Sequence, residues 1–202
     1  MEFQHELIIP NEGLPFKLFL FEGGNGNYER EKHWHTSIEI FAVLKGRLTF
    51  FLNEEEYPLE AGGLVIINSN EIHSIHAPDK NETVVLQIPL KQFERYFTAQ
   101  RFIRFTSAAR IARDKNSEEP DNRKLALFIE ELYKVYQKKA EGWEYRTMAL
   151  YYNILYLLVR DYRETEAAQE EIQDSRRLDA LSKITTYMRE HYREELKLSD
   201  VA

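Results

Sequence analysis

Several features are missing from this 202-residue sequence, and each absence excludes a class of protein. The sequence contains no cysteine, which rules out a disulfide scaffold and any metal site built from thiolates. It also has no excess of basic residues, because 27 Lys and Arg stand against 34 Asp and Glu, for a net charge of −7 at pH 7. This acidic balance opposes tight binding of these residues to the phosphate backbone of nucleic acids.

A signal peptide and a membrane-spanning segment are missing as well. The N-terminus, Met-Glu-Phe-Gln-His-Glu, lacks the basic and then apolar layout of a secretory signal. The longest apolar run lies near Tyr151–Val159, is interrupted by Asn153, and is far shorter than the roughly 20 residues that cross a bilayer. We therefore expect a cytoplasmic protein that has no membrane partner.

The residues from about Phe3 to Pro89 are typical of short β-strands. They are rich in β-branched and aromatic residues, and turn signals such as Lys45-Gly46 and Ala61-Gly62-Gly63 separate the segments. Many short strands at nearly regular spacing, without helices between them, predict a β-sandwich or a small barrel. The expected strands are Glu6–Ile9, Phe16–Phe21, Ser37–Leu44, Arg47–Leu52, Leu64–Ile67, Ile72–His76 and Thr83–Ile88.

After Pro89 the spacing of apolar residues changes from that of strands to that of helices. The polar stretch Ala112–Asn122 is predicted to be a loop, and two long helices follow it, one on either side of Gly142. A short break between two such helices predicts an antiparallel helical hairpin. The second helix is apolar on more than one face, so we expect it to contact both its own domain and a second surface.

The strongest chemical signal is a set of three histidines and one glutamate: His33, His35, Glu39 and His73. Residues of the same parity on a strand share a face, so we expect the first three to point into a barrel together with Phe41. His73 would reach the same place from a second strand. Such a set suits a divalent metal with open coordination positions, and it equally suits hydrogen bonding to an organic ligand.

The two segments that carry these residues resemble the paired motifs of the cupin barrel. The first is His33-x-His35-x3-Glu39-x6-Gly46, and the second is Gly62-x5-Asn68-x-Asn70-x2-His73. The resemblance implies a double-stranded β-helix, or jelly-roll, barrel, and in metal-binding cupins the equivalent three histidines and one glutamate hold a divalent metal. The second motif departs from the metal-binding pattern, which favours Pro, Gly and Asn where this sequence has Asn68, Asn70 and Ala77.

The run Leu64–His73 is instead similar to the Asn-Pro-Asn-Glu-Ile-His string in the cupin sensor domains of AraC-type transcription regulators, with Ser69 in place of Pro. Sensors of this class usually recognise a ligand without a metal, so the resemblance implies that no cofactor is required. The complete set of histidines and glutamate keeps a divalent metal in the barrel as the other interpretation. The expected ligand-binding residues are His33, His35, Glu39, His73 and Phe41, and polar groups among aromatic walls suit a sugar among other polar metabolites.

The end of the sequence is similar to the start of the helix-turn-helix domain in the same regulators. Apolar residues from Leu178 to Tyr192 keep a helical step, and Ser199 followed by Asp200-Val201-Ala202 has the pattern of an N-cap and a second helix. A helix that begins in the last residues indicates a chain cut at the entrance of a DNA-binding domain. Promoter DNA would then be bound only through a domain beyond Ala202.

These patterns divide the chain into four parts. We expect a cupin-like sensing barrel over residues 1–110, a helical dimerisation region over 111–165, a charged linker over 166–177 and the start of a truncated DNA-binding domain over 178–202. Aromatic residues dominate many protein interfaces, so the contacts of the expected homodimer lie on the two helices. They are Leu132, Tyr136, Tyr151, Tyr152, Leu155 and Tyr156.

Three functions fit parts of this sequence. The first is the effector-sensing and dimerising part of an AraC-type transcription regulator, which is not an enzyme. The second is a metal-dependent cupin enzyme, such as a dioxygenase or a sugar isomerase, that uses the three histidines and the glutamate with open coordination positions. The third is a non-catalytic oligomerisation module. The sequence favours the regulator, because an enzyme needs no start of a helix-turn-helix and a module leaves the histidines unexplained.

Overall fold

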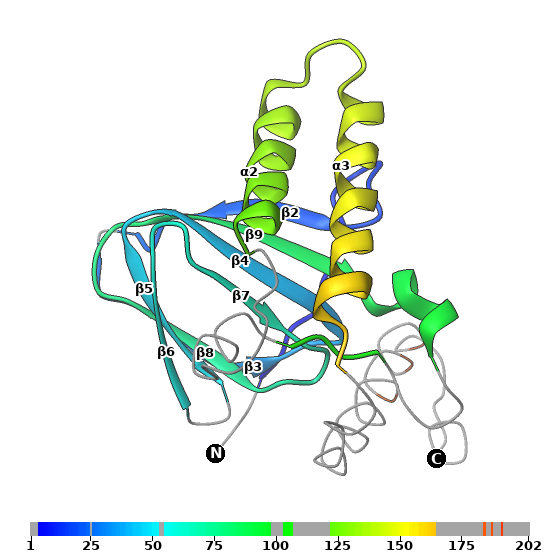
Figure 1. Cartoon of the computed structure of the whole chain (residues 1–202). Coiled ribbons are helices and arrows are strands. Elements are labelled where there is room, and N and C mark those ends of the chain that lie inside the picture. Colours follow the sequence, from blue (N-terminus) through cyan, green and yellow to red (C-terminus); the bar gives the residue numbers. More distant parts are fainter. Residues whose placement is uncertain are drawn as a thin grey trace.

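Two β-sheets form a small barrel in the computed structural model of the chain (Figure 1), which confirms the predicted barrel. The structure describes residues 4–24, 26–52, 55–97, 103–106 and 122–164, together with Ile184, Tyr187 and His191. In chain order the strands are β1 (Gln4–His5), β2 (Lys17–Phe21), β3 (Tyr28–Trp34), β4 (Ser37–Lys45), β5 (Arg47–Leu52), β6 (Glu55–Glu60), β7 (Leu64–Ile67), β8 (His73–Ala77) and β9 (Glu82–Pro89). The five-stranded sheet has the order β1-β3-β8-β5-β6, and the four-stranded sheet has the order β2-β9-β4-β7.

A short 3-10 helix and a helical hairpin follow the barrel. The 3-10 helix η1 spans Leu90–Tyr96, α2 spans Asn122–Lys138, α3 spans Trp143–Leu157, and the π-helical turn η2 (Leu158–Tyr162) extends α3. Gly142, just before α3, has a φ of 76°, a left-handed conformation that glycine adopts without strain. The predicted hairpin with its break at Gly142 is therefore confirmed, and in Figure 1 it stands on the four-stranded sheet.

The four-stranded sheet is a wall with an apolar layer on each side. Ile40 and Leu86 belong to the cluster that includes Ile129 of α2, whereas Phe41 and Val85 belong to a second cluster inside the barrel. Because β4 and β9 are buried on both faces, their sequences are nearly continuous apolar runs instead of alternating ones. The hairpin thus covers one face of this sheet, and the other face lines the barrel.

The connection from β7 to β8 ties the barrel to the chain that follows it. The side chain of Asn68 accepts a hydrogen bond from the backbone N–H of Phe105 at 2.8 Å and donates one to the Phe105 carbonyl oxygen at 2.9 Å. Glu71 accepts a hydrogen bond from Arg104 at 2.6 Å. Arg104 also lies 3.4 Å from a carboxylate oxygen of Glu164, just after η2. These contacts hold the end of the hairpin close to the barrel.

Some strands differ from the sequence prediction. The sequence does not predict β3 or β6, because their charged residues resemble those of loops and turns. β3 reads Tyr-Glu-Arg-Glu-Lys-His-Trp with exposed residues between half-buried ones, and β6 buries only Tyr57 and Leu59. The predicted strand Glu6–Ile9 is wrong, since β1 ends at His5.

Several predicted segments lie outside the described residues. They are most of the loop Ala112–Asn122, the linker over 166–177 and the terminal helices over 178–202, of which only Ile184, Tyr187 and His191 are described. The boundaries of the four predicted parts therefore stay predictions. No helix in the described part of the chain is long and apolar enough to span a lipid bilayer.

We expect Asn68→Ala to lower the free energy of unfolding by about 2 kcal/mol or more, because it leaves two buried backbone groups of Phe105 without a partner. Phe105 is fully buried. The control is Asn153→Ala, which removes an exposed amide from α3 and should change the same free energy by less than about 0.5 kcal/mol. Urea unfolding followed by circular dichroism measures both, and equal effects of the two substitutions would contradict the role given to Asn68.

Candidate ligand and metal site

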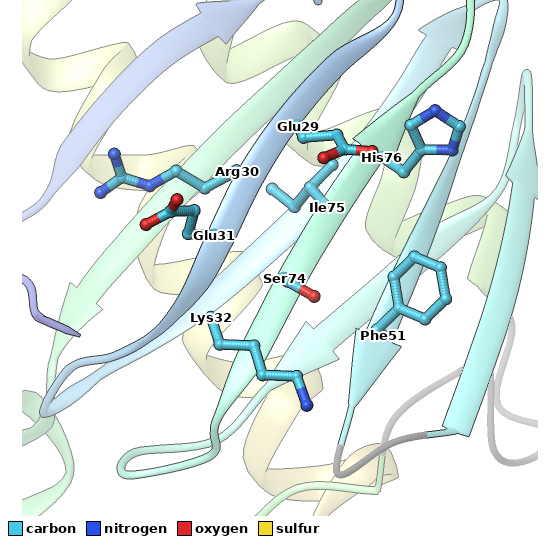
Figure 2. Close-up of a pocket in the computed structure, with 8 residues that line it drawn as sticks. All are labelled: Glu29, Arg30, Glu31, Lys32, Phe51, Ser74, Ile75 and His76. Atoms are coloured by element: carbon cyan, nitrogen blue, oxygen red, sulfur yellow. The ribbon is translucent and has the colours of Figure 1, made fainter. Parts of the chain in front are cut away.

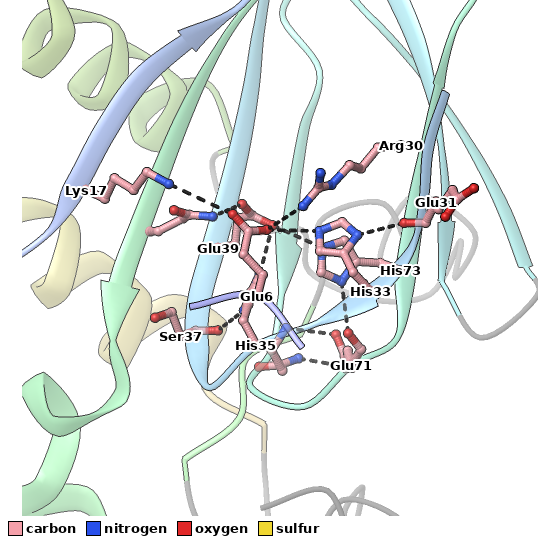
Figure 3. A network of polar contacts seen from close by, with 12 residues as sticks. Glu6, Lys17, Arg30, Glu31, His33, His35, Ser37, Glu39, Glu71 and His73 are labelled. Atoms are coloured by element: carbon pink, nitrogen blue, oxygen red, sulfur yellow. Dashed lines mark hydrogen bonds and ion pairs between the residues drawn. The ribbon is translucent and has the colours of Figure 1, made fainter. Parts of the chain in front are cut away.

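The four predicted site residues meet inside the barrel, but they come from more elements than the sequence indicated. His33 lies near the end of β3, His35 in the connection to β4, Glu39 within β4, and His73 at the start of β8. Because β3 and β4 belong to different sheets, the prediction that the first three share one strand face is wrong. The chain crosses between the sheets at His35, and the two sheets then bring the residues together (Figure 3). All four are buried.

The carboxylate of Glu39 is the centre of this site. Its Oε2 atom lies 3.0 Å from Nε2 of His35 and 3.2 Å from Nε2 of His73. Its Oε1 atom accepts a hydrogen bond of 2.6 Å from the side-chain amide of Gln87. Gln87 stands directly opposite Glu39 in the β4–β9 pair. The register of the sheet therefore positions an amide that no sequence motif marks.

Backbone carbonyl groups orient all three imidazole rings. In each ring, Nδ1 lies close to a carbonyl oxygen two residues away, at 2.9 Å for His33, 3.1 Å for His35 and 2.9 Å for His73. A carbonyl oxygen only accepts hydrogen bonds, so Nδ1 carries the hydrogen and Nε2 of a neutral ring presents a lone pair. The Nε2 atoms of His35 and His73 therefore face the Glu39 carboxylate, and this arrangement is favourable only with a proton or a metal cation between them.

The surroundings shift the pKa values of three of these groups. Burial opposes protonation of His35, but the charge and hydrogen bond of Glu39 outweigh it and raise the pKa of His35 above its ordinary 6.5. Burial would by itself raise the pKa of Glu39, yet the charge and hydrogen bond of His35, aided by His73, hold it far below its ordinary range. Burial, reinforced by the charge of His73, lowers the pKa of His33 to about 4. Without a metal, His35 and Glu39 thus form a buried ion pair beside a neutral His33.

His35, Glu39 and His73 also fit a divalent metal. One ligand atom of each lies within 4.8 Å of the other two, and Nε2 of His73 has no hydrogen-bond partner among the described residues. Two imidazole nitrogens and a carboxylate oxygen suit zinc, iron, nickel or manganese, and rings fixed through Nδ1 are typical of metal-binding histidines. The predicted fourth ligand, His33, is not in this group. Its Nε2 atom lies 3.4 Å from a carboxylate oxygen of Glu6 instead.

A cavity of about 240 Å³ lies inside the barrel beside this site. His33, Glu39 and Phe41 line it, whereas the other two expected ligand-binding residues, His35 and His73, do not. The cavity is smaller than the pockets of roughly 300–1,000 Å³ that hold drug-sized ligands. Its size suits a small metabolite.

Other polar residues of the cavity were not predicted from the sequence. Lys17 lies opposite Gln87, and Gln87 lies opposite Glu39, so the three form one row across the four-stranded sheet. Arg30 lines the cavity together with His33, although strict alternation would place the two on opposite faces. The register of β3 against β8 shifts between them, as at a β-bulge. Pairing and bulges of this kind become visible only in the folded sheet.

A second and larger hollow, of about 560 Å³, lies against β3 and β8. Figure 2 shows its polar lining, which includes Glu29, Glu31, Lys32 and His76. None of the four predicted site residues, all of which the structure describes, lines this hollow. The chemistry of the buried histidines and Glu39 therefore belongs to the smaller cavity.

The predicted interface residues on the helices differ widely in exposure. Leu132 and Tyr151 are fully buried in the chain's own core, and the ring of Tyr151 lies 4.4 Å from that of Phe16. These two offer no surface to a partner, which corrects their predicted role. Tyr136 and Leu155 are half-buried, whereas Tyr152 and Tyr156 are 60% and 57% exposed.

Comparison with known proteins gives one family. A family model described as the AraC-like ligand-binding domain matches residues 15–155. No curated protein matches the chain. Together with the two-sheet barrel and its helices, the family match identifies the fold as a cupin barrel followed by helices.

Solved cupin structures are similar to part of the chain. A cupin 2 conserved barrel domain protein from Salinispora arenicola is 18% identical with a TM-score of 0.37, over 44% of this chain and 76% of that chain. A cupin superfamily protein from Desulfitobacterium hafniense is 11% identical with a TM-score of 0.36, over 41% of this chain and 74% of that chain. A cupin-2 domain containing protein from Shewanella frigidimarina is 21% identical with a TM-score of 0.33, over 40% of this chain and 76% of that chain.

The ion pair of His35 and Glu39 predicts how the stability of the metal-free protein depends on pH. The ion pair with Glu39 raises the pKa of His35 above the ordinary histidine value of 6.5. It therefore stabilises the fold fully when the pH is below 6.5, and this stabilisation is lost as the pH rises through the pKa of His35 in the folded state. We therefore expect the free energy of unfolding to fall as the pH rises above 6.5.

Glu39→Gln is the matched test of this pH dependence, because it removes the charge and keeps the shape. In this variant we expect the fall above pH 6.5 to disappear. Urea unfolding at a series of pH values in the presence of a chelator measures it, and parallel pH profiles for the two proteins would contradict the ion pair.

Proposed function

This chain belongs to the family of AraC-like ligand-binding domains, and on that premise we propose that it is the ligand-sensing and dimerisation part of a sequence-specific bacterial transcription regulator of the AraC type. The observation that carries the proposal is the barrel cavity, whose lining includes His33, Glu39 and Phe41. A concave site with apolar walls and a few convergent polar groups is the usual form of a small-molecule site. The partner in this proposal is a small-molecule effector, and the chain is not an enzyme.

The exposed face of α3 supports the dimerisation part of the proposal. Tyr152 and Tyr156 are four residues apart on one helix, so they lie on the same face, and both are more than half exposed. The hydroxyl of Tyr156 accepts a hydrogen bond of 3.0 Å from Arg160, which also lies over its ring. Exposed aromatic side chains held in a fixed position are common anchors of protein interfaces. Half-buried Tyr136 and Leu155 would lie at the edge of such a contact.

Promoter DNA is bound in this proposal by a separate C-terminal domain. The net charge of −7 gives the present residues little affinity for DNA, and residues 178–202 would begin the DNA-binding part after a linker over 166–177. A dimer would present two such domains to half-sites one helical turn apart, or a multiple of it. The effector would change their arrangement only if it binds two states of the dimer with different affinity. A protein of this kind works in the cytoplasm.

A metal-dependent cupin enzyme is the second candidate function. The specific observation in its favour is the group formed by His35, Glu39 and His73, in which the buried Nε2 of His73 lies 3.2 Å from the Glu39 carboxylate. A divalent metal held there would act as a Lewis acid on a bound oxygen atom. In that case, the three residues would hold the metal and the cavity beside them would hold the substrate.

We expect the chain to form a dimer in solution that Tyr152→Glu weakens at least tenfold, because a charge would then be buried in the contact. The matched control is Leu127→Glu, which places the same charge on α2 at a position 63% exposed. Sedimentation velocity over a range of concentrations measures both. A chain that stays monomeric at high concentration, or a dimer that only Leu127→Glu disrupts, would refute the proposed interface.

Metal content separates the two candidate functions. If the chain is a sensor, we expect less than stoichiometric metal in protein purified without chelators or an affinity tag, because His35 and Gln87 already hydrogen-bond to the Glu39 carboxylate. Stoichiometric iron, nickel, zinc or manganese that is lost in His73→Ala would favour the enzyme. His76→Ala, which removes another imidazole from β8, is the control. Elemental analysis by plasma mass spectrometry gives the metal content of each protein.

A further inference from the structure

The N-terminal segment places a carboxylate inside the barrel cavity. Glu6 follows β1, and its backbone N–H donates a hydrogen bond of 2.9 Å to the carbonyl oxygen of Trp34. Its carboxylate lies among three nitrogen-bearing side chains (Figure 3). Oε1 is 3.9 Å from Nζ of Lys17, and Oε2 is 3.4 Å from both Nη2 of Arg30 and Nε2 of His33. All four residues line the cavity.

The carboxylate of Glu6 lies near the side chains of Lys17, Arg30 and His33 but does not form a short ion pair with any of them. Each distance exceeds the roughly 2.7–2.9 Å of a good charge-assisted hydrogen bond. The backbone hydrogen bond from Glu6 to Trp34 anchors the residue, so the reach of its carboxylate is limited to the length of its side chain. A free carboxylate has no such tether and can approach Lys17, Arg30 and His33 more closely.

The charges of the cavity make Glu6 the replaceable partner. Glu39 already contacts His35, His73 and Gln87. Lys17 and Arg30, by contrast, have Glu6 as their common partner in the structure. When Glu6 leaves, two permanent positive charges remain at the cavity beside His33, and an incoming anion would replace the lost charge.

Gln87 supplies a second polar contact point in the same cavity. Its amide nitrogen donates to Glu39, while its Oε1 atom is buried without a hydrogen-bond partner among the described residues. An unsatisfied buried acceptor is unfavourable, and a hydroxyl or amine of a ligand would satisfy it. Phe19 and Phe41 add apolar walls to the cavity.

We propose that the ligand of the barrel is a small organic carboxylate that also carries a hydrogen-bond donor. Its carboxylate takes the place of Glu6 between Lys17, Arg30 and His33, and its hydroxyl or amine donates to Oε1 of Gln87. This inference rests on the proposed function in one respect, namely that the barrel cavity is the ligand site. A hydroxy acid or a sugar acid has this chemistry, whereas a neutral sugar lacks the charge.

Acetate and acetamide test the charge requirement, because they have the same shape and differ in charge. In Glu6→Ala, we expect acetate to bind at least tenfold more tightly than it binds to the unchanged chain, since a tethered carboxylate no longer competes. Acetamide should not bind measurably. Titrations followed by the imidazole resonances of His33 measure both affinities at the site itself. Glu6→Gln, which keeps the shape of the side chain, should behave in the same way.

Charge-matched variants locate the anion. In the Glu6→Ala chain, Lys17→Gln and Arg30→Gln should each weaken acetate binding at least fivefold. The controls, Lys45→Gln and Arg47→Gln, remove cations that are 71% and 63% exposed, and they should leave acetate binding unchanged.

Two results would overturn the inference, and they differ in what they mean for the proposed function. Equal binding of acetate and acetamide at His33 would show that the site does not require a carboxylate on the ligand. The cavity would then still be the ligand site. If neither probe shifts the His33 resonances, the proposal of a carboxylate ligand is also wrong. The proposed function would then depend on the self-association of the helices alone.

Discussion

The buried carboxylate of Glu39 is the interaction on which the inside of the barrel depends. A carboxylate removed from water costs several kcal/mol unless it is paired and hydrogen-bonded. Two imidazoles and the amide of Gln87 provide these partners, and they come from both sheets and from the connection between them. The two sheets can therefore close on each other only in a register that brings His35, His73 and Gln87 to Glu39. A proton or a divalent metal can satisfy the same geometry.

The sheet that carries Glu39 also connects the cavity with the helices. Phe41 faces the barrel interior, and the adjacent Ile40 packs in the cluster that contains α2 and α3. A ligand in the cavity is thus separated from the hairpin by one layer of strands. Glu71 adds a polar connection, because its carbonyl oxygen orients His73 and its carboxylate pairs with Arg104, which approaches Glu164 after η2. A sensor that acts on the chain beyond the hairpin needs contacts of this kind.

The sequence predicts the parts of this structure that depend on local pattern. The barrel, the hairpin with its break at Gly142, and the meeting of His33, Glu39 and His73 follow from spacing and motif. The sequence does not predict Lys17, Gln87 or Arg30 as cavity residues, because pairing between distant strands and a register shift in β3 place them there. Burial of Tyr151 against Phe16 was also hidden, since apolar spacing alone does not distinguish a core face from an interface.

The most direct test of this account is a crystal structure of the chain with a small hydroxy acid bound. We expect the carboxylate of the acid between Lys17 and Arg30, with Glu6 displaced from the cavity and the hydroxyl at Gln87. An acid bound instead in the larger hollow beside Glu29, Glu31 and Lys32, with Glu6 still in contact with His33, would contradict the account.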